Sequence, residues 1–445
     1  MTSATPASSG TISTSAFASN RSMTRCERVV APSRTSTFIV TSATLPAREV
    51  PSIRGMANTP EPNSEDPFSG IPFLGDIAKA MSGQGPINWD AARQFALLGA
   101  TGGEQEPNVD PASRMALEAL VPIARMHVGD LTGADLSTTD VVTCSRSQWA
   151  ADTLDSYRPL FTDLATALSG ATGVEEDATD PMAQMMAGLS KMMAPAMLGM
   201  AVGSMTGDLA QRCFGVHDLP IPRIDQRLKL IGANIDAFAA QWEIPLDEVR
   251  LWVLAHEFAG QAVLSSPNFA TPLSAMVRQY VAAFRPDPDA VIEKLGGLDP
   301  TSADPMEAIQ QTLGDPSILL GAVSSEEQRE MEPRLDAAVA AVVGFTDWIV
   351  DAVSVRVVGG SALRIAEAVR RQRVEQSPSD VFVHRLLGIR LDEEQVRSGK
   401  QFVQGVVDRV GDDAAIAMLL TGNDRCPTPS EIAAPGLWIA RVSES

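Results

Sequence analysis

Aromatic residues are scarce in this sequence. They make up 5% of its 445 residues, and only two of them are tyrosines. Aromatic and β-branched side chains favour β-sheets, whereas alanine, leucine, methionine and charged helix formers lose little side-chain freedom in a helix. The chain is rich in the second group, and its hydrophobic fraction of 44% is ordinary for a globular protein. The composition therefore predicts a mainly α-helical fold.

Basic residues are also few. Lysine and arginine number 35 against 55 acidic residues, which gives a formal net charge of −20 at pH 7. Nucleic acids need clustered basic side chains to displace the counterions of their phosphates, and anionic membrane surfaces attract the same clusters. The charge therefore argues against nucleic acid as a partner and against binding to an anionic membrane surface.

Recognisable cysteine patterns are absent as well. None of the four cysteines is paired in a Cys-x-x-Cys spacing, so neither a disulfide framework nor a zinc knuckle is expected. Isolated thiols are typical of a reducing compartment, and we expect the protein in the cytoplasm. The sequence also contains no Gly-rich phosphate loop and no Gly-x-Ser-x-Gly nucleophile elbow. These absences argue against a nucleotide-binding or serine-hydrolase site of those types.

The chain has two parts that differ in composition. Residues 1–55 are rich in Ser, Thr and Ala and carry six arginines against two acids. No apolar run follows a basic start, so this part is not a secretory signal. It cannot bury enough apolar surface to fold, and we predict a disordered extension over residues 1–65. An organellar transit peptide and a gene start at Met56 are alternative interpretations. Residues 66–440 are predicted to form one mostly helical domain.

The most apolar stretch of the chain runs from Pro181 to Cys213. Its uncharged part, Met192–Gly207, has 16 residues, fewer than the roughly 20 that span a bilayer. Glycines recur at every fourth position, at Gly199, Gly203 and Gly207. This spacing places three small residues on one helix face, where a second helix can approach closely. We therefore predict a buried core helix, with a membrane span as the alternative.

Only one of the four histidines lies in an informative setting. His256 and Glu257 stand inside a predicted helix, in the segment DEVRLWVLAHEFAG. A helical zinc site needs a second histidine four residues after the first, because positions i and i+4 share one face. The glutamate after the first histidine then activates zinc-bound water. Position 260 is glycine, which has no side chain to offer, so these residues alone indicate a packed core histidine.

Three separated segments resemble the actinobacterial family of zincin-like hydrolases, also described as zinc-dependent metalloproteases. They are DPFSGIPFLGDIAKAMSGQGPINWDAARQ, APAMLGMAVGSMTGDLAQRCFGVHDLPIPR, and DEVRLWVLAHEFAG, whose equivalent in the family carries His-Glu-x-x-His. Their order and spacing extend the similarity over nearly everything after Asp66. The resemblance implies a zincin-like helical domain with the site of a peptidase or hydrolase, and it supports Met56 as the natural start.

The resemblance also implies where the remaining zinc ligands should lie. The segment AVVGFTDWIVDAV resembles one that in related members opens with Glu-Gly and has an aspartate three residues after the glycine. That glutamate would be the third ligand, and the aspartate would orient the site. Val343 stands at the glutamate position and Asp347 matches the aspartate. His256 is then a vestigial ligand and Glu257 a vestigial general base, whereas Gly260 and Val343 depart from the pattern.

These departures predict a zincin scaffold that has lost its peptidase chemistry. Catalytic zinc is held by three protein ligands and a water, and one imidazole does not hold it. We therefore expect no cofactor here, although the family implies zinc, and we expect a binding or scaffold role toward an unidentified protein or peptide. An active metallopeptidase or hydrolase that recruits Asp347, Asp351 or His217 as ligands is one alternative. A membrane-associated helical protein is another.

Replacing the glycine at position 260 tests the hypothesis that the chain lacks one of the zinc-binding histidines. Gly260→His adds the missing imidazole. Because glycine weakens a helix interior, the same change is expected to stabilise the helix by something under about 1 kcal/mol.

Overall fold

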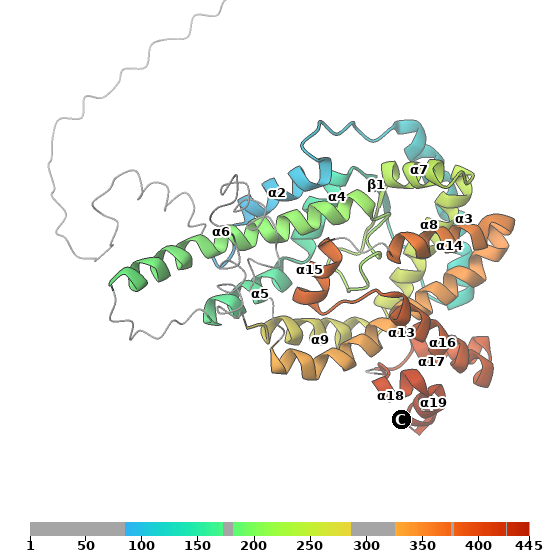
Figure 1. The fold of residues 1–445 in the computed structure, drawn as a ribbon. Helices are drawn as coiled ribbons and strands as arrows, with labels where there is room; N and C mark the ends of the chain where they lie inside the picture. Colours follow the sequence, from blue (N-terminus) through green and yellow to red (C-terminus); the bar gives the residue numbers. More distant parts are fainter. Residues whose placement is uncertain (1–84, 172–180, 286–324, 375–377, 424, 445) are drawn as a thin grey trace, which may run out of the picture. The chain divides into compact units, whose positions relative to one another are not determined.

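A computed structural model of the protein describes five stretches of the chain, residues 85–171, 181–285, 325–374, 378–423 and 425–444 (Figure 1). These stretches belong to one unit of mutually contacting residues, Glu65–Ser445. Most of the described residues are helical, so the predicted mainly α-helical fold is confirmed. The predicted disordered extension over residues 1–65 lies outside the described residues.

The described helices fall into two groups along the chain, before residue 286 and after residue 324. The first group is α2 (Trp89–Thr101), α3 (Pro111–Thr132), α4 (Arg146–Ser156), α5 (Arg158–Ala171), α6 (Pro181–Arg212), α7 (Gly232–Gln241), α8 (Leu246–Leu264) and α9 (Ala270–Ala282). The second group is α13 (Glu326–Val357), the short 3-10 helix η1 (Gly359–Ser361), α14 (Ala362–Val374), α15 (Pro378–Leu387), α16 (Glu393–Val410), α17 (Asp412–Leu420), α18 (Pro429–Ala433) and α19 (Pro435–Glu444).

A two-stranded sheet is the only one among the described residues. β1 (Val141–Cys144) pairs in parallel with β2 (Leu228–Ile231), and all four residues of β2 are buried. The amide of Ile231 also donates to the carbonyl of Phe214, at 2.8 Å. This hydrogen bond connects β2 to the beginning of the 213–218 loop, which follows α6. The loop forms part of the candidate site described below.

Helix α8 is at the centre of the described fold. Pro245 precedes it, and Asp247 and Glu248 lie in its first turn, where negative charge is favourable at a helix N-terminus. Every residue from Trp252 to Leu264 is buried. A helix that is enclosed on all sides belongs to a protein core. It packs against α3, α7, α13 and α14, so residues on α8 can meet side chains from distant parts of the sequence.

The glycine face of α6 packs against another helix, as predicted, and that helix is α2. Gly199, Gly203 and Gly207 are all buried. A Cβ atom added at Gly203 would collide with the carbonyl oxygen of Ala92, and one at Gly207 would lie 2.6 Å from that of Ala96. Two backbones approach so closely only where side chains are absent. This face is an interhelical contact within the protein, as expected for a core helix.

Helix α13 is the one described helix that is long and apolar enough to cross a membrane. Of its apolar window, 67% is buried inside the protein. A core helix meets the same criteria of length and composition, and α13 packs against α3, α8, α9 and α16. It therefore gives only weak support to the membrane-associated alternative.

Substitution of Gly203 tests the α2–α6 contact. Gly203→Ala is expected to lower the free energy of unfolding by about 1–3 kcal/mol, because the new methyl group overpacks the interface. Gly203→Leu is expected to cost more, and urea denaturation measures both. Gly360→Ala is the matched control, since nothing lies within 4 Å of a Cβ at that position. A Gly203→Leu protein with the denaturation midpoint of the unmodified chain would show that the two helices do not pack in this way.

Candidate functional site

His256 lies on the enclosed part of α8 with both ring nitrogens directed at polar groups. Its ring stacks on that of Trp252, with centroids 5.6 Å apart and planes 12° from parallel. Its Nε2 lies 3.2 Å from Nη2 of Arg373, and its Nδ1 lies 3.5 Å from Oε1 of Glu257. A guanidinium offers only donors, so Nε2 accepts the hydrogen bond. His256 is therefore a neutral imidazole whose proton is on Nδ1, facing Glu257.

The carboxylate of Glu257 is completely buried. It accepts hydrogen bonds from the backbone amides of Val216 and His217, at 3.0 and 3.2 Å, and from Nδ1 of His217 at 3.1 Å. Burial raises the pKa of Glu257, but hydrogen bonds from His217 and His256 outweigh it and lower the pKa to about 2. Glu257 is thus ionised at neutral pH and holds the loop through these hydrogen bonds.

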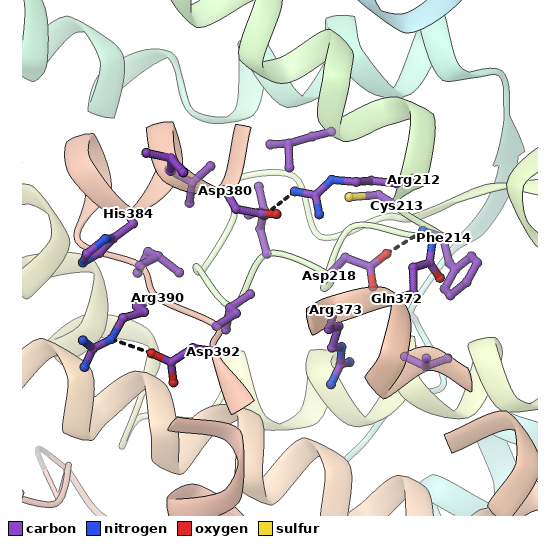
Figure 2. Close-up of a pocket in the computed structure, with 17 residues that line it drawn as sticks. Arg212, Cys213, Phe214, Asp218, Gln372, Arg373, Asp380, His384, Arg390 and Asp392 are labelled. Carbon is purple, nitrogen blue, oxygen red and sulfur yellow. Dashed lines mark hydrogen bonds and ion pairs between the residues drawn. The ribbon is translucent and has the colours of Figure 1, made fainter. Parts of the chain in front are cut away.

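The 213–218 loop brings His217 against Gly260. Oδ2 of Asp218 accepts from the amides of Phe214 and Gly215, the first of which Figure 2 shows, and Trp149 Nε1 donates to the carbonyl of Gly215 at 3.0 Å. A Cβ atom built at Gly260 would lie 2.6 Å from Cβ of His217. The side chain of His217 therefore fills the place that a side chain at position 260 would take.

This contact corrects one expectation from the sequence. Gly260→His was expected to stabilise α8, because glycine is a poor helix former. The new side chain would instead collide with Cβ and Cγ of His217, which are not the flexible end of a side chain. The substitution alone is therefore expected to destabilise the protein, and an imidazole fits at position 260 only if His217 is made smaller.

Helix α13 faces α8 across a very small cavity of about 20 Å³. Val343 and Asp347 of α13 line it, together with His256, Gly260 and His217. The sequence-predicted positions are thus brought together. A cavity of this size holds about one water molecule, so no substrate fits in it.

Asp351, which the sequence also suggested as an alternative metal ligand, does not line this cavity. It lies one turn beyond Asp347 on α13 and pairs with Nζ of Lys400 at 2.6 Å. Of the alternative ligands that the sequence offered, only His217 and Asp347 therefore line the cavity.

Arg373 is the residue at this site that the sequence did not reveal. It extends from the last turn of α14, and its Nη1 lies 3.3 Å from Oδ1 of Asp347, while Nη2 contacts His256. Arginine near a helix C-terminus is common, because it interacts favourably with the helix dipole. Nothing in the segment ALRIAEAVRRQRV therefore distinguishes Arg373 from the arginines at 370 and 371.

Arg373 also borders two larger cavities. One, of about 170 Å³, is shown in Figure 2, where Arg212 pairs with Asp380. Asp218 and Arg373 also line it, but most of its lining surface is apolar. The other, of about 290 Å³, lies between α8, α13, α14 and α16. All three cavities have Arg373 and Leu391 in their walls. Arg373 therefore separates the small cavity at His256 from the spaces around it.

The residues at this site do not fit a zinc ion. Within the described stretches of the chain, no three His, Cys, Asp or Glu residues form a group that could hold a metal. Gly260 and Val343 offer no donor, and the guanidinium of Arg373 lies between His256 and Asp347. Bound catalytic zinc needs three protein ligands around an open position.

Comparisons with known proteins identify what this chain resembles. A family model described as "Zincin-like metallopeptidase" matches residues 87–439. A solved structure from Chloroflexus aurantiacus, provisionally described as a hydrolase with a novel fold, is similar with a TM-score of 0.53 and 21% identity, covering 81% of this chain and 99% of that one. At this level of identity the likeness shows the fold alone. No curated protein matches the sequence significantly.

The buried Glu257 predicts a pH-dependent contribution to stability. Its pKa is lowered from 4.5 to about 2, so the ionised form stabilises the folded state above pH 4.5 and this contribution is lost as the pH falls toward 2. Such a shift of the pKa corresponds to a contribution on the order of 3 kcal/mol to the free energy of unfolding at neutral pH. Glu257→Gln is expected to be less stable than the unmodified chain at pH 7, and the difference should narrow below pH 4.5.

Urea unfolding at a series of pH values measures this difference. Glu104→Gln serves as the control, because Glu104 is exposed and substitution there should change stability little at any pH. A constant difference between the unmodified chain and Glu257→Gln from pH 7 to pH 3 would contradict the assigned role.

Proposed function

Since this chain belongs to the zincin-like metallopeptidase family, we propose that it is a member that lacks catalytic zinc and binds a protein or peptide without cleaving it. The cytoplasm is the proposed location, and nucleic acid is not a proposed partner, because the chain carries a net charge of −20.

The surroundings of Glu257 are the observation that carries this proposal. A general base must reach the water that it deprotonates, directly or through one other water. The carboxylate of Glu257 has no exposed surface, and both of its oxygens are engaged by the amides of the 213–218 loop and by two imidazoles. Its low pKa also makes it a weak base. Glu257 therefore holds the loop instead of activating water.

The ligand set supports the same conclusion. Two of the three expected donor positions are occupied by Gly260 and Val343, which cannot coordinate a metal. The third, His256, already has its Nε2 hydrogen-bonded to Arg373. A chain with this scaffold but without these groups has no ligand set with which to activate a zinc-bound water.

The cavity of about 290 Å³ beside the site is the proposed place of binding. Trp252 and Leu391 contribute apolar walls, whereas Arg373, Arg397 and Glu393 add charged groups. Its volume approaches the lower end of the range for small-ligand pockets. An apolar floor with charged groups of both signs suits one or two residues of a peptide, whose side chain is apolar and whose backbone or terminus is polar.

One observation favours an alternative function. His217 lies where the side chain of the missing second histidine would lie, and Asp347 lines the same small cavity. An active hydrolase with an altered ligand set would use His256, His217 and Asp347, and these side chains would have to move, because in the described residues they do not form a group that could hold a metal. In that case Arg373 would have to leave the position between His256 and Asp347.

Metal analysis of the purified chain, made without a histidine tag, distinguishes these functions. We expect well under one equivalent of zinc per chain and no peptidase activity on a library of casein-derived and synthetic peptides. Stoichiometric zinc that is lost in a His256→Ala variant would favour the active-hydrolase alternative. Arg278→Ala is a suitable control, since that residue forms an exposed ion pair with Asp163 remote from the site.

Rebuilding the ligand set tests the same proposal in the opposite direction. A triple variant, His217→Ala with Gly260→His and Val343→Glu, removes the collision and supplies both missing donors. We expect it to bind zinc at least tenfold more tightly than the unmodified chain in a competition titration. Val343→Glu alone should be destabilising, because it buries an unpaired carboxylate until a metal compensates its charge. A triple variant that folds and gains no zinc affinity would mean that the frame is not that of a zinc site.

A further inference from the structure

The cavity of about 290 Å³ between α8, α13, α14 and α16 has a wall in which basic side chains outnumber acidic ones. The four basic and three acidic side chains are Arg370, Arg373, Arg397 and Lys400, and Asp347, Asp351 and Glu393. The whole sequence has the opposite balance, with 35 basic and 55 acidic residues. An anionic group is therefore attracted to this cavity more than to an average part of this acidic chain.

Arg397 is the basic side chain of this wall with the most distant ionic partner. The other three pair at 2.6 to 3.3 Å with Asp347, Asp351 and Glu367. Arg397 approaches Glu393 to 3.9 Å, and these two side chains are 58% and 64% exposed. An exposed contact of that length contributes little. The guanidinium of Arg397 is thus available to a ligand, and it can bind a carboxylate through two parallel hydrogen bonds.

Apolar side chains form the remainder of the cavity wall. Trp252 of α8, Val350 of α13 and Val369 of α14 line it, and all three are buried. Leu391 and Val396 extend this apolar surface toward α16. An apolar side chain that enters such a space leaves water, which is favourable in proportion to the area that it buries. The volume is near the lower end of the range for ligand pockets, so it suits a single residue better than an extended peptide.

We propose that this cavity binds the C-terminal residue of a partner polypeptide, with its carboxylate on Arg397 and its apolar side chain against Trp252. This inference rests on the proposed function, because it specifies which part of a peptide the same site takes. A C-terminal residue carries an apolar side chain and an anion together, and it continues in one direction only. An internal residue brings peptide chain on both sides, for which the cavity is small. A free amino terminus would add a positive charge to a wall that already has an excess of them.

A groove beside the cavity provides a path for the rest of the peptide. It has a volume of about 430 Å³, and it shares Asp351, Lys400 and Gln401 with the cavity wall. Trp348 lines this groove, and its ring stacks on that of Phe345 with centroids 6.3 Å apart. Tryptophan is enriched where proteins contact one another, because a rigid ring buries a large area. The residue that precedes the C-terminal one is therefore expected against Trp348.

Isothermal titration of the unmodified chain with N-acetylated tetrapeptides tests this proposal. Peptides of sequence Gly-Ser-Gly-X, in which X is leucine, isoleucine, valine, methionine or phenylalanine, are compared as free acids and as C-terminal amides. We expect at least one free acid to bind with one peptide per chain. Its amide should bind about tenfold more weakly, because the charge that pairs with Arg397 is removed. An amide with an internal aspartate, Gly-Asp-Gly-X, should not recover the affinity, and recovery would show that the site takes a side-chain carboxylate instead.

Variants of the cavity wall identify the groups that bind the peptide. Arg397→Gln should weaken the free acid about fivefold and leave the amide within about twofold, which separates recognition of the carboxylate from a general change in structure. Arg114→Gln is the matched control, because Arg114 is also exposed, has Glu118 at 3.7 Å and does not line the cavity. Ala366→Phe fills the cavity and should abolish binding of both forms, whereas Leu363→Phe, at an 80% exposed position of the same helix, should not.

The proposal is overturned if the amides bind as tightly as the free acids, if Arg397→Gln weakens both forms equally, or if no peptide binds. If Ala366→Phe does not fold, the comparison of acid and amide on Arg397→Gln still decides. Failure of the proposed function has a different signature, namely stoichiometric zinc and peptidase activity in the unmodified chain. A zinc-free chain that binds amidated peptides tightly would refute only the preference for a C-terminal residue.

Discussion

The buried carboxylate of Glu257 is the interaction on which the arrangement of this site depends. It is fixed in the central helix, α8, and it binds the amides of Val216 and His217 in the 213–218 loop. Gly215 is required beside it, since a Cβ atom there would collide with the carboxylate. The loop conformation then places the side chain of His217 over Gly260. One buried anion thus determines where the loop lies and what fills the space on α8.

Arg373 supplies the remaining hydrogen bonds of the site that is built around Glu257. Glu257 fixes both imidazoles through their Nδ1 atoms, and Arg373 satisfies the Nε2 of His256 together with Asp347. Each polar group named here therefore has a partner from the protein itself. A metal ion is not needed to satisfy them, which is the physical basis for proposing that a zincin scaffold persists here without zinc.

Much of the fold was predictable because its determinants are local. Scarce aromatic residues and abundant helix formers indicated a helical protein, and the spacing of Gly199, Gly203 and Gly207 identified an interhelical face that does pack on α2. The positions of His256, Gly260, Val343 and Asp347 around one cavity followed from the resemblance to a family. The match over residues 87–439 confirms that the chain belongs to the zincin-like metallopeptidase family.

The parts that were not predictable depend on contacts between distant residues. Arg373 is 117 residues from His256 in the sequence, and as one of several arginines on an amphipathic helix it carries no distinguishing pattern. The collision of a side chain at Gly260 with His217 depends on the path of the 213–218 loop. That path cannot be inferred from the helix propensity of glycine. The role of Glu257 as an anchor likewise depends on that path. Whether the zinc site is lost stays a prediction.

The protonation of the His256 ring is the most direct test of the central claim, that His256 is hydrogen-bonded to Arg373 and Glu257 and does not bind catalytic zinc. Long-range ¹H–¹⁵N correlation spectra of the unmodified protein distinguish a protonated Nδ1 from a protonated Nε2, and they detect metal coordination of either nitrogen. We expect His256 as the neutral tautomer with its proton on Nδ1, and we expect its Nε2 resonance to stay unchanged after one equivalent of Zn²⁺ is added. A shift of that Nε2 resonance to a metal-bound position on addition of Zn²⁺ would contradict the claim.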